Sequence, residues 1–234
     1  DCWEWIEAAE NAFRFITSHM TDQDGRLYHV WCDGAARHAG VLEDYANMSE
    51  AALVLYGITQ DQTYLTRVMD WIKILENEFL DVVRGGFYMS SIHVADLLVR
   101  PKSAQDGAVP SGNGTMVGVL ARLYQLTGNS AYADLASKTA EAFSGEIIGH
   151  VFPFATLLNN SDFLLNPVSV ILMAKPGADD LPAFHHVLRT LSLPTLMKTD
   201  LLSDKILPKD HPAFGKMPID EKTTAYVCFG QQCL

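Results

Sequence analysis

Two stretches of the chain repeat one pattern at a fixed distance. "LYGITQDQTYL" (55–65) and "LYQLTGNSAYA" (123–133) match at Leu, Tyr, an aliphatic residue, Thr and a second Tyr, and Tyr124 lies 68 positions after Tyr56. Each copy predicts a helix, a tight turn and a second helix. Because a single helical hairpin cannot bury its own apolar face, repeated hairpins must stack on one another.

The helix before each turn differs in composition from the helix after it. The first is rich in Ala, Gly, Leu and Val with few charges, which indicates a buried inner helix, and the second carries charge on one side, which indicates an outer helix. This alternation predicts a mainly α chain, a partial (α/α)6 toroid of about three helical hairpins, where the closed form has six. We expect inner helices at 41–58, 111–126 and from near Pro153, and outer helices at 3–20, 62–80 and 130–145.

The pattern changes after residue 166. "VSVILMAKP" is a short apolar run, "DDLPAFHHVLRTL" predicts a helix, "TLMKTDLL" is another apolar run, and "TAYVCFG" could supply a third strand. Strand, helix and strand in this order are typical of a βαβ unit. We therefore divide the chain into a partial toroid at 1–166 and a small C-terminal α/β element at 167–234 packed on it.

The charge and hydropathy of the chain bear on whether it binds nucleic acid or a membrane. Lys and Arg total 17 against 28 Asp and Glu, a net charge of −11, so without a basic cluster we expect no nucleic-acid partner. No apolar run is long enough for a membrane helix, and we expect a soluble, cytoplasmic protein. Because the chain opens at Asp1 without Met and is in a helical pattern by Trp3, we also expect a processed or truncated N-terminus.

The four cysteines are widely spaced and form no CxxC motif. This spacing favours reduced thiols in a cytosol-like compartment. Cys228 and Cys233 nevertheless lie close enough in "YVCFGQQCL" to pair under oxidation or to share a metal. We find no HExxH, GxSxG, GxGxxG or Walker motif, so we expect no metal and no cofactor.

Each inner helix follows a long polar segment. Residues 25–46 lead into the first and residues 85–113 into the second, and both are longer than packed helices require. If the hairpins are equivalent, both segments lie on one rim of the toroid. In the second segment, the "FYM" and "LLV" runs could pair as a hairpin and cover the mouth.

Carboxylates on these segments are candidates for proton transfer. Glu43 and Asp44 start the first inner helix, and Asp106 precedes the second. Their simplest role is to cap free amides and to complement the helix dipole. Two carboxylates across a mouth could instead act as general acid and base, provided that burial separates their pKa values.

Other polar and aromatic residues on the same segments are candidates for ligand binding. Arg100 and Lys102 flank Pro101 and suggest a polar pocket. Ser111 is a plausible N-cap, and with Asn113 it could bind hydroxyl groups at a helix start. Trp31 and Tyr45 could stack on a sugar ring, or they could fill the toroid.

The motifs together resemble a known family. "GVLEDYA", "GGFYM", "VRPKSAQDGAVPSGN", the "LYxLTGNxxYA" turn, "HPAFGK" and "AYVCFGQQC" occur in this order and are similar to those of the thioredoxin-domain-containing family that includes spermatogenesis-associated protein 20. The resemblance covers essentially the whole chain. It implies an N-terminal thioredoxin-like domain followed by a toroid of the six-hairpin glycosidase and N-acylglucosamine 2-epimerase type, of which this chain matches the C-terminal part.

Three functional hypotheses follow. The chain could be part of a carbohydrate-active toroid, an epimerase, an isomerase or a glycoside hydrolase, that binds a sugar or another small polar ligand. It could be a non-catalytic module that serves the thioredoxin-like domain. The polar segments could also be only the architecture of the mouth. Because half a toroid exposes inner-helix surface, we further expect a homodimer or low stability.

Overall fold

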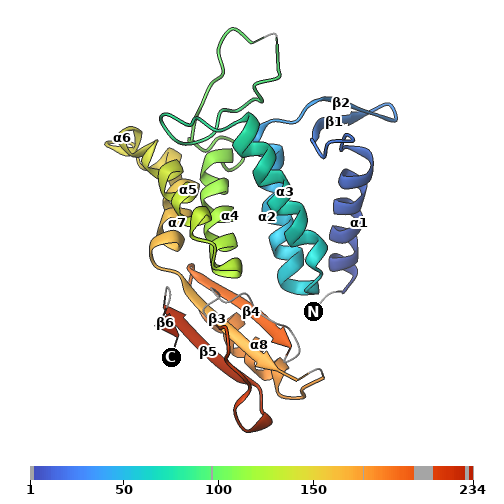
Figure 1. Cartoon of the computed structure of the whole chain (residues 1–234), viewed down its shortest axis with the longest axis vertical. Coiled ribbons are helices and arrows are strands. Elements are labelled where there is room, and N and C mark those ends of the chain that lie inside the picture. The colour runs from blue at the N-terminus through green and yellow to red at the C-terminus, as the bar shows by residue number, and fades with distance from the viewer. Residues whose placement is uncertain (1–2, 96, 176, 203–212, 230–231, 234) are drawn as a thin grey trace.

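The structure is a computed structural model that describes residues 3–95, 97–175, 177–202, 213–229 and 232–233, with the backbone alone at 202, 232 and 233. A helical layer lies on one side of a small sheet (Figure 1). Its helices are α1 (Trp3–His19), α2 (Leu42–Thr59), α3 (Gln62–Glu78), α4 (Gly112–Thr127), α5 (Ser130–Glu141), α6 (Ser144–Ile147) and α7 (Ala155–Leu165), the last preceded by a 3-10 turn, Phe152–Phe154.

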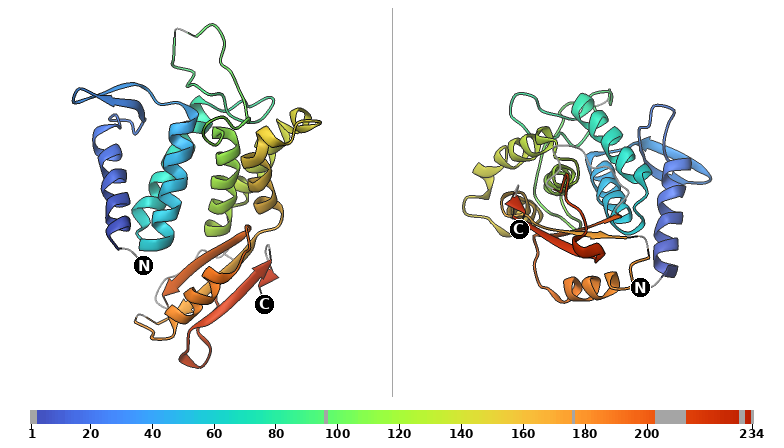
Figure 2. Two further views of the ribbon diagram at one scale, coloured as in Figure 1. Left: turned by 180° about the vertical axis from the view of Figure 1, so that it is seen from behind. Right: turned by 60° about the horizontal axis from the view of Figure 1, so that its bottom comes forward.

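Inner and outer helices alternate as the composition predicts. Helix α4 packs against α2 on one side and α7 on the other, while α3 covers α2 and α5 covers α4. Views from behind and from below show α2, α4 and α7 as neighbours within the helical layer (Figure 2). The predicted partial toroid of helical hairpins is therefore confirmed.

The repeated turn has the same hydrogen bonds in both copies. Gln60 and Gly128 end their helices in the left-handed conformation, with φ of 59° and 73°. The next residue, Asp61 or Asn129, then accepts a hydrogen bond from a backbone amide two positions later and starts the outer helix. A left-handed C-cap followed at once by an Asx N-cap produces the tight reversal that the repeat predicts.

Glycines allow the inner helices to approach closely at one end. A Cβ added to Gly112 would lie 2.7 Å from the Leu42 side chain of α2, and one added to Gly114 would lie 2.9 Å from the Leu157 amide of α7. The N-termini of α2, α4 and α7 therefore meet at one rim. The long segments that lead into α2 and α4 lie on the same end of the stack, as the repeat predicts (Figure 2).

The C-terminal element is a four-stranded sheet in the order β4-β3-β5-β6. Strand β3 pairs in parallel with β4 across the α8 crossover and antiparallel with β5, so the predicted βαβ unit and third strand are confirmed. The Ser169 hydroxyl of β3 donates to Gln125 of α4 and links the two layers. The elements are β3 (Val168–Ala174), α8 (Leu181–Thr190), β4 (Leu196–Leu202), a 3-10 turn (Ile219–Glu221), β5 (Thr224–Phe229) and β6 (Gln232–Cys233).

Two features of the loops differ from the predictions. Strands β1 (Tyr28–Cys32) and β2 (Ala35–Ala39) form a hairpin that the sequence reading missed. Its turn, Asp33-Gly34, has two positive φ angles, 51° and 75°, and an Asp-Gly pair between strands is a recognised signal. Conversely, the predicted FYM and LLV hairpin is wrong, because no strand forms in the described part of residues 87–99.

The cysteine prediction is also corrected. Cys228 is disulfide-bonded, and Cys233 of β6 is its register partner in the antiparallel pair of β5 and β6. Cys32 is a free, exposed thiol. The expectation of reduced thiols is therefore wrong for Cys228. The "HPAFGK" motif lies partly outside the described residues.

Candidate functional site

Asp106 ties two inner helices together at the rim. Its Oδ1 accepts a hydrogen bond from the Ser111 amide at 2.9 Å, and its Oδ2 accepts one from the Thr156 amide at 2.8 Å. Burial favours the protonated carboxyl, but these amides outweigh it and lower the pKa of Asp106. Both oxygens of this predicted acid or base are thus engaged at the starts of α4 and α7.

The two cations beside Pro101 also bind the protein itself. Arg100 donates to the carbonyls of Ser90 and Glu78 at 2.7 Å, and its guanidinium lies 4.3 Å from the centre of the Tyr88 ring. Lys102 Nζ lies 2.7 Å from Asp81 Oδ2, and this hydrogen bond is the main reason that the pKa of Asp81 is lowered. These contacts indicate a scaffold role in place of the predicted ligand-binding role.

Ser111 and Asn113 also form hydrogen bonds within the protein. The Ser111 hydroxyl accepts from the Gly114 amide as the N-cap of α4. Asn113 is fully buried, accepts from the Phe87 amide, and donates to the carbonyls of Phe87 and Ser103. The SGN motif therefore starts α4, with Ser111 as the predicted N-cap, and fixes the preceding loop; a role in binding hydroxyl groups stays a prediction.

The aromatic candidates differ in exposure. Tyr45 is 2% exposed, its hydroxyl accepts from the Leu27 amide, and burial raises its pKa to about 12. Of the two alternatives, stacking on a sugar or filling the toroid, the burial of Tyr45 favours filling the toroid. Trp31 of β1 is partly exposed and makes an edge contact with Phe15 at 5.3 Å.

The two carboxylates that start α2 have separate roles. Asp44 Oδ2 accepts from the Val41 amide at 2.8 Å, as in a capping box, and it also pairs with His29 Nδ1 at 2.9 Å. The neighbouring Glu43 makes no such contact. Its Oε2 is buried and has no hydrogen-bond partner among the described residues.

Glu43 belongs to one face of α2. Asn47 and Glu50 follow at spacings of four and seven residues, so all three share a side of the helix. Leu42 points to α4 and Tyr45 packs on Phe79 next to α3. The face with Glu43 and Glu50 therefore points away from the outer helix.

Helix α4 presents an equivalent face. Thr115 and Arg122 lie seven residues apart, and Thr115 is the repeat partner of Asn47 at the offset of 68 residues. On the opposite side of α4, Asn113 contacts the outer loop. We call Glu43, Asn47, Glu50, Thr115 and Arg122 the axial face.

Three of the buried polar atoms without partners among the described residues belong to the axial face, while Ser49 and Trp71 carry others. Glu43 Oε2, Thr115 Oγ1 and Arg122 Nη1 are all buried and lack a hydrogen bond within the described residues. Buried polar groups are normally satisfied, so a group of such atoms indicates an absent ligand or water. The contacts of the rim motif hold the starts of α4 and α7 next to this face.

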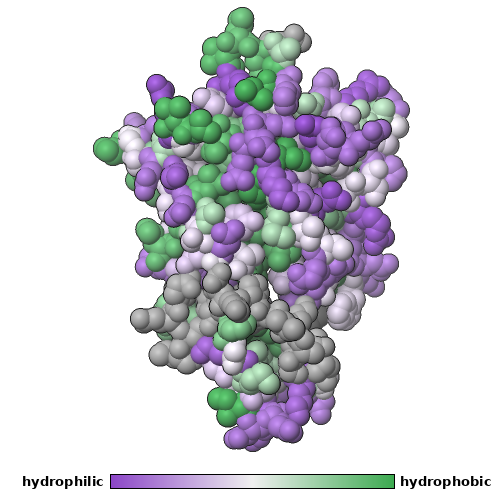
Figure 3. Space-filling model, in the orientation of Figure 1, coloured by the Kyte–Doolittle hydropathy of each residue, from purple (hydrophilic) through white to green (hydrophobic). Residues whose placement is uncertain are grey.

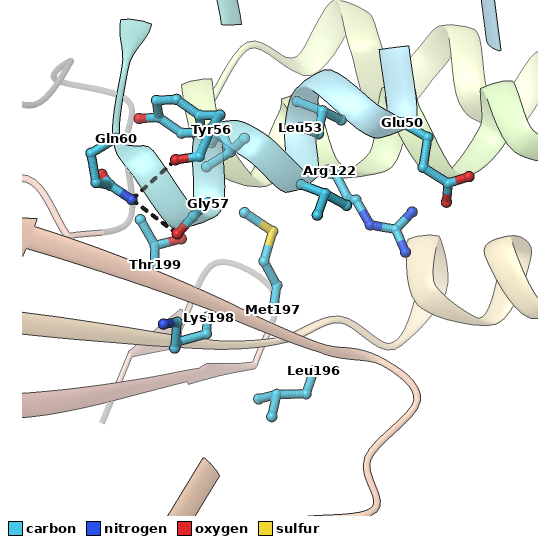
Figure 4. Close-up of a pocket in the computed structure, with 12 residues that line it drawn as sticks. Glu50, Leu53, Tyr56, Gly57, Gln60, Arg122, Leu196, Met197, Lys198 and Thr199 are labelled. Carbon is cyan, nitrogen blue, oxygen red and sulfur yellow. Dashed lines mark hydrogen bonds between the residues drawn. The ribbon is translucent and has the colours of Figure 1, made fainter. Parts of the chain in front are cut away.

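A cavity of about 240 Å³ adjoins the lower part of the axial face. It lies between α2, α4 and β4 (Figure 4), with Glu50 and Arg122 at one end and Lys198 and Thr199 of β4 on its floor. Gln60 closes the other end and donates weakly, at 3.4 Å, to the carbonyls of Tyr56 and Gly57 (Figure 4).

The sequence reading missed Glu50, Thr115 and Arg122. A usable signal existed, because Arg122 is the one charged residue of α4 and Glu50 the one charged residue of α2 beyond its first turn. A lone charge within an otherwise apolar buried helix needs a partner or a function.

Apolar side chains are exposed in two other places. A groove of about 1290 Å³ runs between α1, α2, α8 and β4, with Trp3, Trp5 and Val54 among its residues. The loop above the rim carries the exposed Leu98 and Val99, and Figure 3 shows apolar surface at the top of the molecule.

The described part of the chain shows neither a metal site nor a membrane-spanning helix. Within those residues, no group of three or more His, Cys, Asp and Glu side chains is placed to hold a metal ion. No helix there combines the length and apolar character needed to cross a membrane.

The comparisons with known proteins agree with the sequence motifs. No family model matches the chain. Spermatogenesis-associated protein 20 is 27% identical over 97% of this chain in both Rattus norvegicus and Homo sapiens, and an uncharacterized protein of Caenorhabditis elegans is 22% identical over 98%. The resemblance is thereby confirmed. The chain spans about a third of the length of these curated relatives, 31% and 32%.

A solved structure supports the architecture. A GH76 α-mannanase of Bacteroides thetaiotaomicron matches 67% of this chain and 44% of its own chain, with a TM-score of 0.53 and 17% sequence identity. At this identity the likeness shows the fold alone.

Proposed function

We propose that this chain is the C-terminal part of an α/α toroid that binds a carbohydrate or similar small polar ligand along the axial face. The three buried, unpartnered polar atoms of Glu43, Thr115 and Arg122 carry this proposal. A sugar offers hydroxyl groups that both donate and accept, so it could satisfy a carboxylate, a hydroxyl and a guanidinium at once.

On this proposal the toroid acts on its ligand by proton transfer, as an epimerase, an isomerase or a glycoside hydrolase. We assign the proton transfer to Glu43, because its Oε2 has no hydrogen-bond partner among the described residues. The adjacent Asp44 holds the partly exposed His29 at 2.9 Å, and this pair could relay a proton between solvent and the mouth. Asp106 would support the site by fixing α4 to α7.

Glu43→Gln separates binding from turnover. Binding of glucose, mannose, galactose and N-acetylglucosamine to the purified protein is measured by saturation-transfer NMR, and conversion by proton spectra of the same samples. We expect Glu43→Gln to keep binding and lose turnover, whereas Glu7→Gln, an exposed control on α1, changes neither. Absence of binding by all four sugars would overturn the proposal.

A second candidate is a non-catalytic binding module, for which the resemblance suggests a thioredoxin-like domain as the partner. One observation favours it. Both carboxylate oxygens of Asp106 accept backbone amides, so Glu43 has no second carboxylate at the rim that could act with it as an acid–base pair. Binding of a sugar without conversion by the wild-type protein would select this candidate. The expected homodimer stays a prediction.

A further inference from the structure

Arg122 is a cation without an anion. It is the one charged residue of α4, and its guanidinium makes no hydrogen bond or ion pair with any residue that the structure describes. Burial lowers its pKa, and the Glu50 carboxylate opposes this, but an arginine remains charged throughout the physiological range. Its buried Nη1 therefore has no acceptor among the described residues.

The guanidinium lies between α7 and the cavity that Arg122 lines, with its Nη1 buried. Its carbon lies 4.8 Å from the centre of the Phe163 ring, so α7 covers one flat face. The donors of a guanidinium lie in its plane and match the two oxygens of a carboxylate or phosphate. Stacking on a ring therefore holds the side chain without using the donors.

The nearest acid does not neutralise this charge. Glu50 is close enough to affect the pKa of Arg122, yet the two form no ion pair in the structure. Both side chains reach the same end of the cavity (Figure 4). The floor adds another cation, Lys198, which pairs with Asp200 at 3.1 Å, so the cavity wall is far less acidic than the chain with its charge of −11.

The cavity also sets the size of the group that it could hold. Its volume of about 240 Å³ is below the roughly 300–1,000 Å³ of pockets for drug-sized ligands. A single substituted sugar ring suits this space better than an oligosaccharide. Seven residues separate Glu43 from Glu50 on α2, about 10 Å along the helix, so a ligand of one or two rings could reach from rim to cavity.

We propose that the ligand of the axial face carries an anionic group, a carboxylate or a phosphate ester, and that Arg122 binds it in this cavity. This proposal rests on the proposed function and narrows the ligand to acidic sugars. The negative charge of Glu50 lies close enough to Arg122 to act on its pKa, so it repels an anion bound beside Arg122. Glu50 therefore lowers the affinity of the chain for the acidic ligand.

The test compares glucose, glucuronate and glucose 6-phosphate as probes, with inorganic phosphate as the anion alone. Affinities are measured by calorimetry for the wild type, Arg122→Met, Glu50→Gln and Arg14→Met. Arg14 is exposed on α1 and bonds only to Asn11, so its replacement removes the same charge away from the site.

We expect at least one acidic sugar to bind the wild type about tenfold to a hundredfold more tightly than glucose, as a charge-assisted pair allows. Arg122→Met should abolish this preference, and Arg14→Met should retain it. Glu50→Gln should tighten binding of the acidic sugar. Glucuronate and glucose 6-phosphate distinguish a carboxylate from a phosphate ester.

The two proposals fail in different ways. Equal binding of glucose and both acidic sugars by the wild type and Arg122→Met would overturn the anion site and leave the proposed function standing. Binding of inorganic phosphate that depends on Arg122, without binding of any sugar, would support the anion site and overturn the proposed function. If circular dichroism shows that Arg122→Met does not fold, unchanged affinity in Glu50→Gln overturns the anion site.

Discussion

Asp106→Asn distinguishes a scaffold role from a catalytic role for this residue. The carboxylate accepts amides at the starts of two helices, from Ser111 at 2.9 Å and from Thr156 at 2.8 Å. An asparagine has the same shape but only one acceptor oxygen, so its NH2 group would face one of these donors. A catalytic residue would lose activity and keep stability, whereas this bridge should lose stability.

The expected loss follows from those two bonds. A hydrogen bond to a charged group contributes about 1.5–3 kcal/mol, and a neutral one about 1 kcal/mol. Asp106→Asn removes one charged bond and weakens the other, so we expect the free energy of unfolding to fall by about 2–4 kcal/mol. With a urea m-value of about 3 kcal/mol/M, the midpoint should fall by about 1 M.

Urea unfolding followed by circular dichroism checks this value, with Asp61→Asn as the control. Asp61 caps α3 through one amide, and asparagine is an equally good N-cap, so the control midpoint should stay unchanged. Equal midpoints for the wild type and Asp106→Asn would refute the scaffold assignment. Loss of turnover with an unchanged midpoint would restore the catalytic one.

The dependence on pH provides a second check. The pKa of Asp106 is lowered in the folded chain, so its contribution is complete above the unfolded value of about 3.9. It is lost as the pH falls through the lower folded value, because the unfolded state then binds the proton more readily. The stability difference between the wild type and Asp106→Asn should therefore shrink below about pH 4.

Two further substitutions test the rim by the same assay. Lys102→Met leaves the Asp81 carboxylate, which is 7% exposed, without its cation and should lower the free energy of unfolding by about 3–5 kcal/mol. Lys73→Met on the surface of α3 is the control and should change the free energy of unfolding little. Equal urea midpoints for the two variants would contradict a structural ion pair. Gly114→Ala places a Cβ 2.9 Å from the backbone of α7 and should cost about 1–3 kcal/mol. Gly57→Ala, with nothing within 4 Å, should stabilise α2 by about 0.5–1 kcal/mol, and similar effects at the two glycines would refute the close packing of α4 on α7.

The hairpins could be predicted because their signals are local. At both repeated turns, a Thr, a left-handed residue and an Asx cap follow one another, and each acts on atoms within four positions of itself. The loop above the rim gave no such signal. There, the Met89 amide donates to the Pro101 carbonyl and Arg100 donates to the Ser90 carbonyl, so the segment closes near its ends and the FYM and LLV runs do not pair.

The site was only partly predictable for the same reason. The sequence placed polar residues correctly on one rim, and it named capping as an alternative for Glu43, Asp44 and Asp106. It could not show that the second amide bound by Asp106 comes from Thr156, 50 positions away. When a partner far away in the sequence bonds to a polar group in this way, a residue that looks available for a ligand has a structural role instead.

A lone charge in a buried segment has the same appearance in a sequence whether it is structural or functional. Lys102, two positions after Arg100 on the loop, and Arg122, the one charged residue of α4, both suggest a pocket. The coordinates separate them: Lys102 finds Asp81, 21 positions earlier, while Arg122 has an aromatic ring on one face and no acceptor among the described residues. An unpaired cation that is largely removed from water is costly, and the proposed anionic ligand in the adjoining cavity would give Arg122 the charge-assisted partner that Glu50 does not supply as an ion pair.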